Sequence, residues 1–322
     1  MSETVRSLLN VFGVLIGVLS IAGLLVWVER RLLALFQERY GPNRVGPFGL
    51  LQTVADTIKL IWKEDWVPPF ADRFLFVLAP AVIVVTGLLG FLIIPIAPGI
   101  GVADVSVGIL VFLAVSSMGA YSVVLAGWAS NSKYSLIGGV RSAAQMVSYE
   151  VFMGLALMGV VLQAGSFNLR EIVHAQEGLW YCIPQVVGMT VFFIAGLAEA
   201  HRLPYDLPEA ESELIAGYHS EYSGMKFAMF MVGEYVGITV LSALLVTLYF
   251  GGWMGPFLPP IVWFLIKVML VIGLFILIRG ALPRPRYDQL MASGWKVMLP
   301  LALANLVVTG FAVLWHAGGG TP

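Results

Sequence analysis

Residues 8–28 read LLNVFGVLIGVLSIAGLLVWV, a run without a single charged side chain. An α-helix needs about 20 predominantly apolar residues to cross the hydrocarbon core of a bilayer. The apolar region of a cleaved signal peptide is shorter, ~7–15 residues. The run ends at Glu29-Arg30-Arg31, three charges that would stop transfer. We therefore interpret it as the first transmembrane helix rather than as a removed signal.

The composition of the whole chain is typical of a membrane protein. Of 322 residues, 59% are hydrophobic and only 11% are charged, whereas soluble domains carry roughly 25% charged residues. The net charge of −1 gives no reason to expect nucleic acid as a partner. The single cysteine, Cys182, excludes an internal disulfide and an iron–sulfur cluster, which typically needs about four cysteines. The histidines are scattered, so no metal site is expected, and no GxGxxG or Walker motif predicts a bound nucleotide.

Further apolar runs predict an all-α, polytopic membrane protein, with residues 1–322 forming a single integral membrane domain. About eight transmembrane helices are expected, near 6–28, 74–97, 105–128, 141–164, 183–200, 226–250, 258–280 and 297–316. An even number puts both termini on one side. Apart from Arg6, Arg170 and Lys267, all Lys and Arg then fall on the other side or at its helix ends. Since positive residues mark the cytoplasmic side, we expect both termini outside and the long loops inside.

Four tryptophans at predicted span ends are interpreted as residues of the membrane interface. They are Trp128, Trp180, Trp253 and Trp315.

The first inner loop, residues 29–73, contains a segment with helical amphipathic spacing. Its apolar positions are Leu51, Val54, Ala55, Ile58, Ile61 and Trp62, and the opposite face carries Gln52, Asp56, Lys59 and Lys63. This pattern predicts a helix lying in the plane of the membrane interface. Such a helix could be a surface anchor, or a lid over a cavity with Asp56 and Lys59 facing inward.

The inner loop 201–225 is rich in acidic residues. Pro204 and Pro208 forbid a continuous helix between them, although a short helix could begin at Pro208. Glu209 and Glu213 would then share one face, with Glu211 pointing elsewhere. An acidic run is usually a solvated loop. However, this loop lies between Glu199 and Glu234, two acids within predicted spans.

Charged side chains also occur deep inside the predicted spans, where they are costly and usually functional. Glu150 and Glu234 lie ~13 Å and ~12 Å from the ends of their spans by helical rise, and Lys267 lies inside another. One interpretation is structural: Lys267 neutralises Glu150 or Glu234 in a buried pair, whose disruption would cost ~3–5 kcal/mol. The other is a proton route through carboxylates of raised pKa. The two are compatible.

Several ordered motifs between residues 29 and 296 resemble one family, that of the heel subunit (the H subunit) of bacterial respiratory complex I. The matching stretches are ERR at 29–31, RYGPNRVG at 39–46, EAHRLPYDLPEAESEL at 199–214, EYSGMKF at 221–227 and RGALPRPRYDQ at 279–289. The resemblance implies a membrane subunit of a proton-pumping NADH:quinone oxidoreductase in the bacterial inner membrane. Quinone would enter from the lipid through a tunnel formed with partner subunits. NADH, FMN and the iron–sulfur clusters would be bound by those partners, and this chain would hold no cofactor alone.

The resemblance also assigns roles to residues, none of which forms a complete catalytic site on this chain. The expected quinone tunnel comprises Glu29, Arg30, Arg39, Asp56, Lys59, Phe227, Met231 and Arg279. The expected coupling path toward the neighbouring membrane subunits and the antiporter-like pumps comprises Glu150, Glu199, Arg202, Asp206, Glu209, Glu211, Glu213, Glu221, Glu234 and Lys267.

Two other functions remain open on the sequence. The counterpart subunit of membrane-bound hydrogenases shares the ancestry, although the dense tunnel and loop motifs favour the quinone enzyme. A stand-alone secondary transporter usually shows internal repeats, and no repeat of fixed period is visible here.

Overall fold

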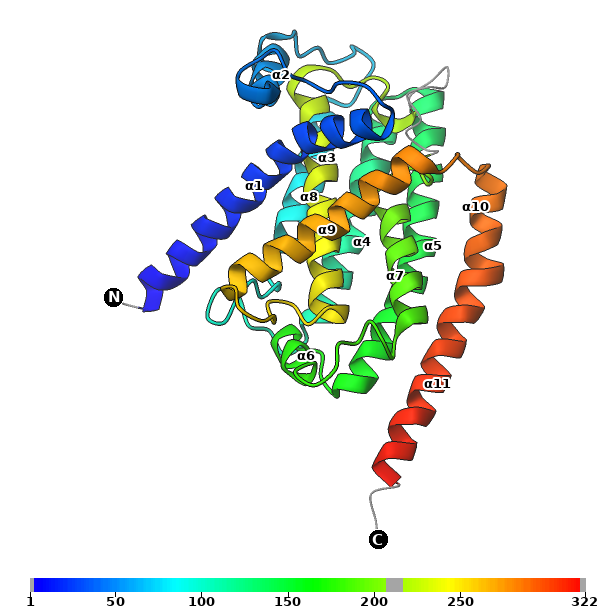
Figure 1. Ribbon diagram of the computed structural model, residues 1–322. Helices are drawn as coiled ribbons and strands as arrows, with labels where there is room; N and C mark the ends of the chain where they lie inside the picture. Colours follow the sequence, from blue (N-terminus) through cyan, green and yellow to red (C-terminus); the bar gives the residue numbers. More distant parts are fainter. Residues whose placement is uncertain (1–2, 207–216, 319–322) are drawn as a thin grey trace.

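A computed structural model describes residues 3–206 and 217–318, and within them it is a bundle of α-helices (Figure 1). Seven helical segments of this described part are long and apolar enough to cross a membrane. They are α1 (Glu3–Phe36), α3 (Arg73–Gly90), α4 (Gly108–Ala129), α5 (Lys133–Ala164), α8 (Gly224–Tyr249), α9 (Pro260–Ala281) and the run from α10 (Tyr287–Ser293) through a π-helical turn (Gly294–Met298) into α11 (Leu299–Gly318). With the shorter apolar helix α7 (Val186–Glu199), this confirms the predicted polytopic all-α fold.

Three helical segments extend well beyond the predicted spans, and the run formed by α10 and α11 begins at Tyr287 rather than at 297. α1 continues to Phe36, so Glu29 and Arg30 lie on the helix rather than after it. The segment between Glu29 and Phe36 consists of good helix formers, and no proline or glycine interrupts it. α5 begins at Lys133 instead of 141. Apolar runs report the lipid-exposed length of a helix, and polar ends that continue it carry no hydropathy signal.

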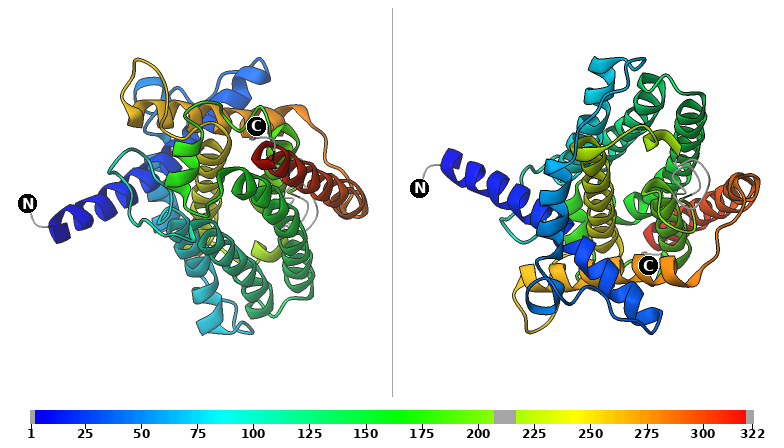
Figure 2. Two further views of the ribbon diagram at one scale, coloured as in Figure 1. Left: turned by 90° about the horizontal axis from the view of Figure 1, so that it is seen from below. Right: turned by 90° about the horizontal axis from the view of Figure 1, so that it is seen from above.

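The most buried helix of the bundle is α8, which packs against α1, α3 and α9. Views from both ends show it near the centre, while the N-terminal half of α1 projects away from the other helices (Figure 2). Small residues allow α3 and α8 to approach closely, as in many membrane helix pairs. A Cβ on Gly233 would lie 2.9 Å from Cγ2 of Ile83, and one on Gly87 would lie 2.9 Å from Cγ1 of Val236. This contact fixes the rotation of α8 and thus the direction of Glu234.

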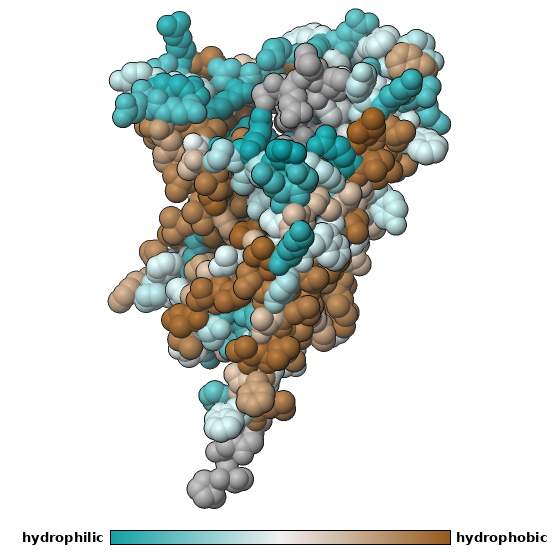
Figure 3. Space-filling model, turned by 90° about the vertical axis from the view of Figure 1, so that its right-hand side faces the viewer, coloured by the Kyte–Doolittle hydropathy of each residue, from teal (hydrophilic) through white to brown (hydrophobic). Residues whose placement is uncertain are grey.

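The amphipathic helix α2 (Gln52–Trp62) lies at one end of the bundle, and α6 (Leu169–Ala175) lies at the other (Figure 1). The apolar side chains of α2 are exposed, with Ile61 at 59% and Trp62 at 82%, which suits a helix resting on lipid. Hydrophilic residues gather at the α2 end of the molecule, while hydrophobic residues cover the flank of the bundle below (Figure 3).

Candidate functional site

A polar cavity of about 360 Å³ opens at the end of the bundle that carries α2. It lies among the C-terminal half of α1, the segment 201–206, the 3-10 turn η3 (Gly217–His219), the start of α8 and the end of α9 with its following loop. Its lining residues are Glu29, Arg30, Leu33, His201, Arg202, Leu203, Asp206, His219, Met231, Glu234, Tyr235, Arg279 and Arg284. Five segments far apart in the sequence therefore build one charged chamber.

Four charged side chains form a cluster in the wall of this cavity; three of them are buried, and Arg279 is 35% exposed. The Arg202 guanidinium lies between two carboxylates, 3.2 Å from Glu29 and 3.3 Å from Glu234. Arg279 pairs with Glu29 from the other side, and Arg202 also stacks over the ring of Tyr235 at 4.6 Å. Burial acts to lower the pKa of Arg202, but Glu234 and Glu29 outweigh it and raise that pKa above its usual range. Two acids and two arginines give a cluster of zero net charge, the arrangement that buried charges require.

A bidentate ion pair closes the cavity on its outer edge. Arg284 donates to both carboxylate oxygens of Asp206, at 2.8 and 2.7 Å. The pair joins the segment that follows α7 to the loop between α9 and α10. Such fork geometry is among the stronger hydrogen-bonded contacts of proteins, so it sets the spacing of these two walls.

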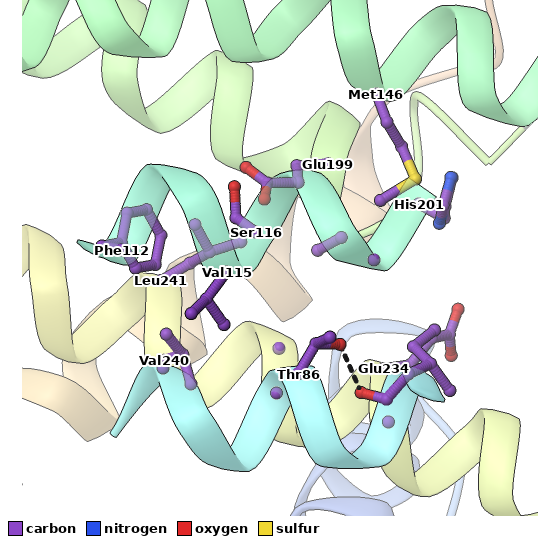
Figure 4. Close-up of a pocket in the computed structure, with 17 residues that line it drawn as sticks. Thr86, Phe112, Val115, Ser116, Met146, Glu199, His201, Glu234, Val240 and Leu241 are labelled. Atoms are coloured by element: carbon purple, nitrogen blue, oxygen red, sulfur yellow. Dashed lines mark hydrogen bonds between the residues drawn. The ribbon is translucent and has the colours of Figure 1, made fainter. Parts of the chain in front are cut away.

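A second, smaller cavity of about 90 Å³ continues from the first into the bundle (Figure 4). His201 and Glu234 line both cavities. In Figure 4 the Glu199 carboxylate points toward Ser116, across the cavity from Glu234. One Glu199 oxygen, Oε2, is buried and has no hydrogen-bond partner among the described residues.

A third carboxylate, Glu150, stands beyond Glu199. Ser116 donates to it at 3.3 Å, and Ser117 also donates to it. Ser116 contacts Glu199 as well, so one hydroxyl lies between the two acids. The order from the polar cavity inward is therefore Glu234, Glu199 and Glu150, on α8, α7 and α5.

Comparison with known proteins identifies the family. A family model described as NADH dehydrogenase matches residues 9–310. The chain belongs to the NADH dehydrogenase family. A relative from Methylococcus capsulatus (strain ATCC 33009 / NCIMB 11132 / Bath), named as the H subunit of an NADH-quinone oxidoreductase, is 62% identical over 308 residues, which cover 95% of this chain and 98% of the relative. The resemblance drawn from the motifs is thereby confirmed.

In this NADH dehydrogenase family chain, the structure brings together half of the expected tunnel residues at the polar cavity, namely Glu29, Arg30, Met231 and Arg279. Phe227 lies behind its wall, against the ring of His219. Asp56 is joined to the cavity through Arg30, 2.6 Å away. Partial burial acts to raise the pKa of Asp56, but the hydrogen bond from Arg30 outweighs it and lowers that pKa.

Two of the expected tunnel residues do not face the cavity. The Lys59 side chain is 73% exposed and only reaches Asp56 at 3.7 Å, so it does not face inward as the lid interpretation requires. Arg39 is exposed beyond the end of α1 and donates to Gln37. The sequence pattern around these two positions does not determine which face of the segment is exposed.

The expected coupling path is assembled in part. Glu234, Glu199 and Glu150 form the series just described, Arg202 contacts Glu234, and Asp206 lines the polar cavity, where it binds Arg284. Glu221 lines neither of the two cavities. Glu209, Glu211 and Glu213 lie outside the described residues.

Lys267 makes no ion pair with an acid among the described residues, so the structural interpretation in which it neutralises Glu150 or Glu234 is wrong. Its ammonium group donates to the backbone oxygens of Phe250, Gly252 and Met254, at 2.6, 3.1 and 2.6 Å. It also lies 4.3 Å from the centre of the Trp180 ring. The loop after α8 turns inward through two glycines of positive φ, which aligns its carbonyl groups on one cation.

The same loop explains a second wrong prediction. Trp253 is 5% exposed and contacts the His174 ring at 5.8 Å, so it is a core residue rather than an interface residue. Trp128 and Trp315, by contrast, are 66% and 72% exposed, as a residue facing lipid requires.

Sequence reasoning missed several residues of the polar cavity. They are Leu33, His201, Leu203, His219, Tyr235 and Arg284. His201, Leu203 and Arg284 lie within the motifs that resemble the family, and this was the only feature of the sequence that could have indicated them. The burial of His201 lowers its pKa to about 4, against the opposing effect of Glu234 and Asp206, so the ring is neutral at pH 7.

Proposed function

We propose that the polar cavity receives the headgroup of a quinone, as the membrane part of an NADH-quinone oxidoreductase. The observation that carries this proposal is the cluster of Glu29, Arg202, Glu234 and Arg279, which lines the cavity and reaches the Glu199 pocket through Glu234. The volume of about 360 Å³ falls in the range of small-molecule sites, roughly 300–1,000 Å³. The family and the name of the Methylococcus relative supply the substrate class.

The redox centres of this reaction would belong to partner subunits. A chain with one cysteine has too few thiolates for an iron–sulfur cluster, and it carries no motif for NADH or FMN. The partners would therefore include hydrophilic subunits that carry the terminal cluster above the α2 end of the molecule. Smaller membrane subunits would continue the path from Glu150 toward the antiporter-like pumps.

The three acids of α8, α7 and α5 would couple quinone chemistry to proton movement. Reduction of a quinone to a quinol takes up two electrons and two protons, so the charge and proton demand of the cavity change. Glu234 contacts Arg202 and lines both cavities, so it would be the first acid to respond to that change. A residue transmits energy only if its interactions differ between the two states. The Arg202–Glu234 contact is the bond whose strength would differ.

The distribution of charge supports an orientation. The cavity, α2 and the start of α10 share one end, and the connections rich in Lys and Arg are there. Positive residues mark the cytoplasmic side. The cavity would therefore open toward the cytoplasm, with α6 and both termini on the periplasmic side of the inner membrane.

Deletion and replacement of the gene test the proposed function. In membranes lacking the chain, inhibitor-sensitive NADH:quinone reduction should vanish, and restoring the chain should recover it. Oxidation of NADH by ferricyanide reports the hydrophilic partners and serves as the control. Quinone reduction that is unaffected by the loss would overturn the proposal and favour the hydrogenase counterpart or a lone transporter.

Single substitutions test the coupling path. Glu150→Gln and Glu234→Gln remove a titratable group from opposite ends of the acid series, so the rate of quinone reduction or the protons pumped per electron should fall in reconstituted vesicles. Glu177→Gln is the control, because that acid pairs with His174 at the far end of the bundle. An unchanged rate and ratio in both path variants would exclude them from the relay.

A further inference from the structure

His219 is a buried polar side chain that lines the polar cavity, and its hydrogen-bonding groups have no protein partner among the described residues. The residue is 4% exposed and lines the cavity wall. Neither ring nitrogen, Nδ1 nor Nε2, has a hydrogen-bond partner among the described residues. Leaving such a group unsatisfied costs about 1–3 kcal/mol, and buried polar groups in native proteins are nearly always bonded. Two unsatisfied nitrogens on one ring therefore indicate a ligand.

The ring is held in place by its surroundings. It contacts the edge of Tyr218, with ring centroids 5.3 Å apart, and it leans on Phe227 at 5.6 Å. The short turn that carries it packs directly on α5, where a Cβ on Gly138 would lie 2.8 Å from the backbone of Gly217. These contacts limit the movement of the ring, so it keeps its place in the cavity wall.

The chemistry of the ring defines the ligand. Burial lowers the pKa of His219 to about 4, with a further contribution from His201, so the imidazole is neutral near pH 7. A neutral imidazole offers one N–H donor and one acceptor nitrogen. It suits an oxygen that can accept a hydrogen bond in one state and donate one in another, as a quinone carbonyl and a quinol hydroxyl do.

The charged side chains of the cavity are paired with one another. Arg202 and Arg279 bind Glu29, and Arg284 binds Asp206. Nε of Arg202 is also buried without a hydrogen-bond partner among the described residues, but its guanidinium is held between Glu29 and Glu234. An uncharged ligand would disturb none of these pairs, and His219 is a wall residue with hydrogen-bonding capacity to spare for it.

We propose that His219 binds and orients one headgroup oxygen of the quinone or quinol in the polar cavity. The proposal rests on the proposed function of that cavity. It assigns His219 a binding role, because no reacting group of this chain lies beside it. The second headgroup oxygen would then lie toward the arginine-rich side of the chamber.

The test compares His219→Phe with His219→Gln in the intact complex, using a short-chain quinone as the varied substrate. Phenylalanine keeps the ring volume and removes both hydrogen-bonding groups. The KM for quinone should rise about two- to tenfold in H219F, which corresponds to ~0.5–1.5 kcal/mol for a neutral hydrogen bond, while kcat changes less. Glutamine offers a donor and an acceptor, so H219Q should return much of the lost affinity. His174→Gln, at the opposite end of the bundle, should match the wild type.

The outcomes distinguish failure of the His219 role from failure of the quinone-chamber assignment. KM does not depend on the amount of enzyme, so it can be measured even if H219F assembles poorly. Equal KM values for wild type and H219F, or for H219F and H219Q, would overturn the role of His219. Arg279→Met is the second variant. If its KM for quinone rises while the KM of H219F equals that of the wild type, the cavity is still the quinone chamber and only the role of His219 is excluded. If neither variant alters quinone kinetics, the chamber assignment itself fails.

Discussion

Replacing Arg202 by glutamine removes the cation that lies between two buried carboxylates. The side chains of Glu29 and Glu234 are only 6% and 9% exposed, so water cannot take the place of the guanidinium. Removing one partner of a buried pair costs about 3–5 kcal/mol, because the remaining charge stays in a poorly solvated place. At 1.4 kcal/mol for each factor of ten, this is roughly a hundred- to a few-thousand-fold change in the folding equilibrium.

The effect is measurable as chain abundance and as the temperature at which membrane-bound quinone reduction is lost. The R202Q complex should be present at a low level and should inactivate at a temperature several degrees below that of the wild type. Adding Glu234→Gln removes one of the stranded charges, so the double variant should be more stable than R202Q alone, with a coupling of ~0.5–3 kcal/mol.

The matched control is Arg170→Gln, which breaks an ion pair with Asp104 whose side chains are 33% and 47% exposed. Such surface pairs contribute ~0–1 kcal/mol, and this variant should behave as the wild type. An R202Q complex no less stable than R170Q, or a double variant less stable than R202Q, would show that Arg202 does not stabilise these buried carboxylates.

Two further predictions concern other buried groups. Lys267→Met leaves three loop carbonyls without their ammonium donor, and charge-assisted bonds contribute ~1.5–3 kcal/mol each. The variant should inactivate at a lower temperature while the quinone KM stays constant, and a raised KM with normal stability would return Lys267 to the coupling path. For His219, the ordinary histidine pKa of 6.5 is lowered to about 4, so the neutral form persists as the pH falls from 8 to 6. The quinone KM should be flat over that range, and a change centred near pH 6.5 that disappears in H219Q would contradict the burial argument.

The transmembrane helices were predictable because hydropathy reports directly on contact with lipid. The mid-membrane acids were equally visible, since a charge in an apolar run has no ordinary explanation. Glu150 and Glu234 were singled out for this reason, and they stand at the two ends of the acid series. Motif resemblance added Glu29 and Arg279, which lie 250 positions apart in the sequence and pair in the fold.

The partners of individual side chains were not predictable in the same way. Lys267 binds backbone carbonyls, and every residue has one, so no residue type in the sequence marks the acceptors. Lys59 and Trp253 were misplaced because neither a helical pattern nor a position at a span end determines whether the side chain is covered by neighbouring residues. His219 carried no pattern at all. Its importance arises from burial beside a cavity, a property of tertiary packing alone.

The most direct test of the quinone chamber is photolabelling of the intact complex with a photoreactive short-chain quinone, followed by mass spectrometric mapping of the labelled peptides. If the polar cavity is the quinone chamber, label should appear on the segments that line it, around residues 29–33, 201–206, 219, 231–235 and 279–284, and should be lost when excess unmodified quinone is present. Label confined to lipid-facing side chains such as those of α11, or label that excess quinone does not displace, would contradict that assignment.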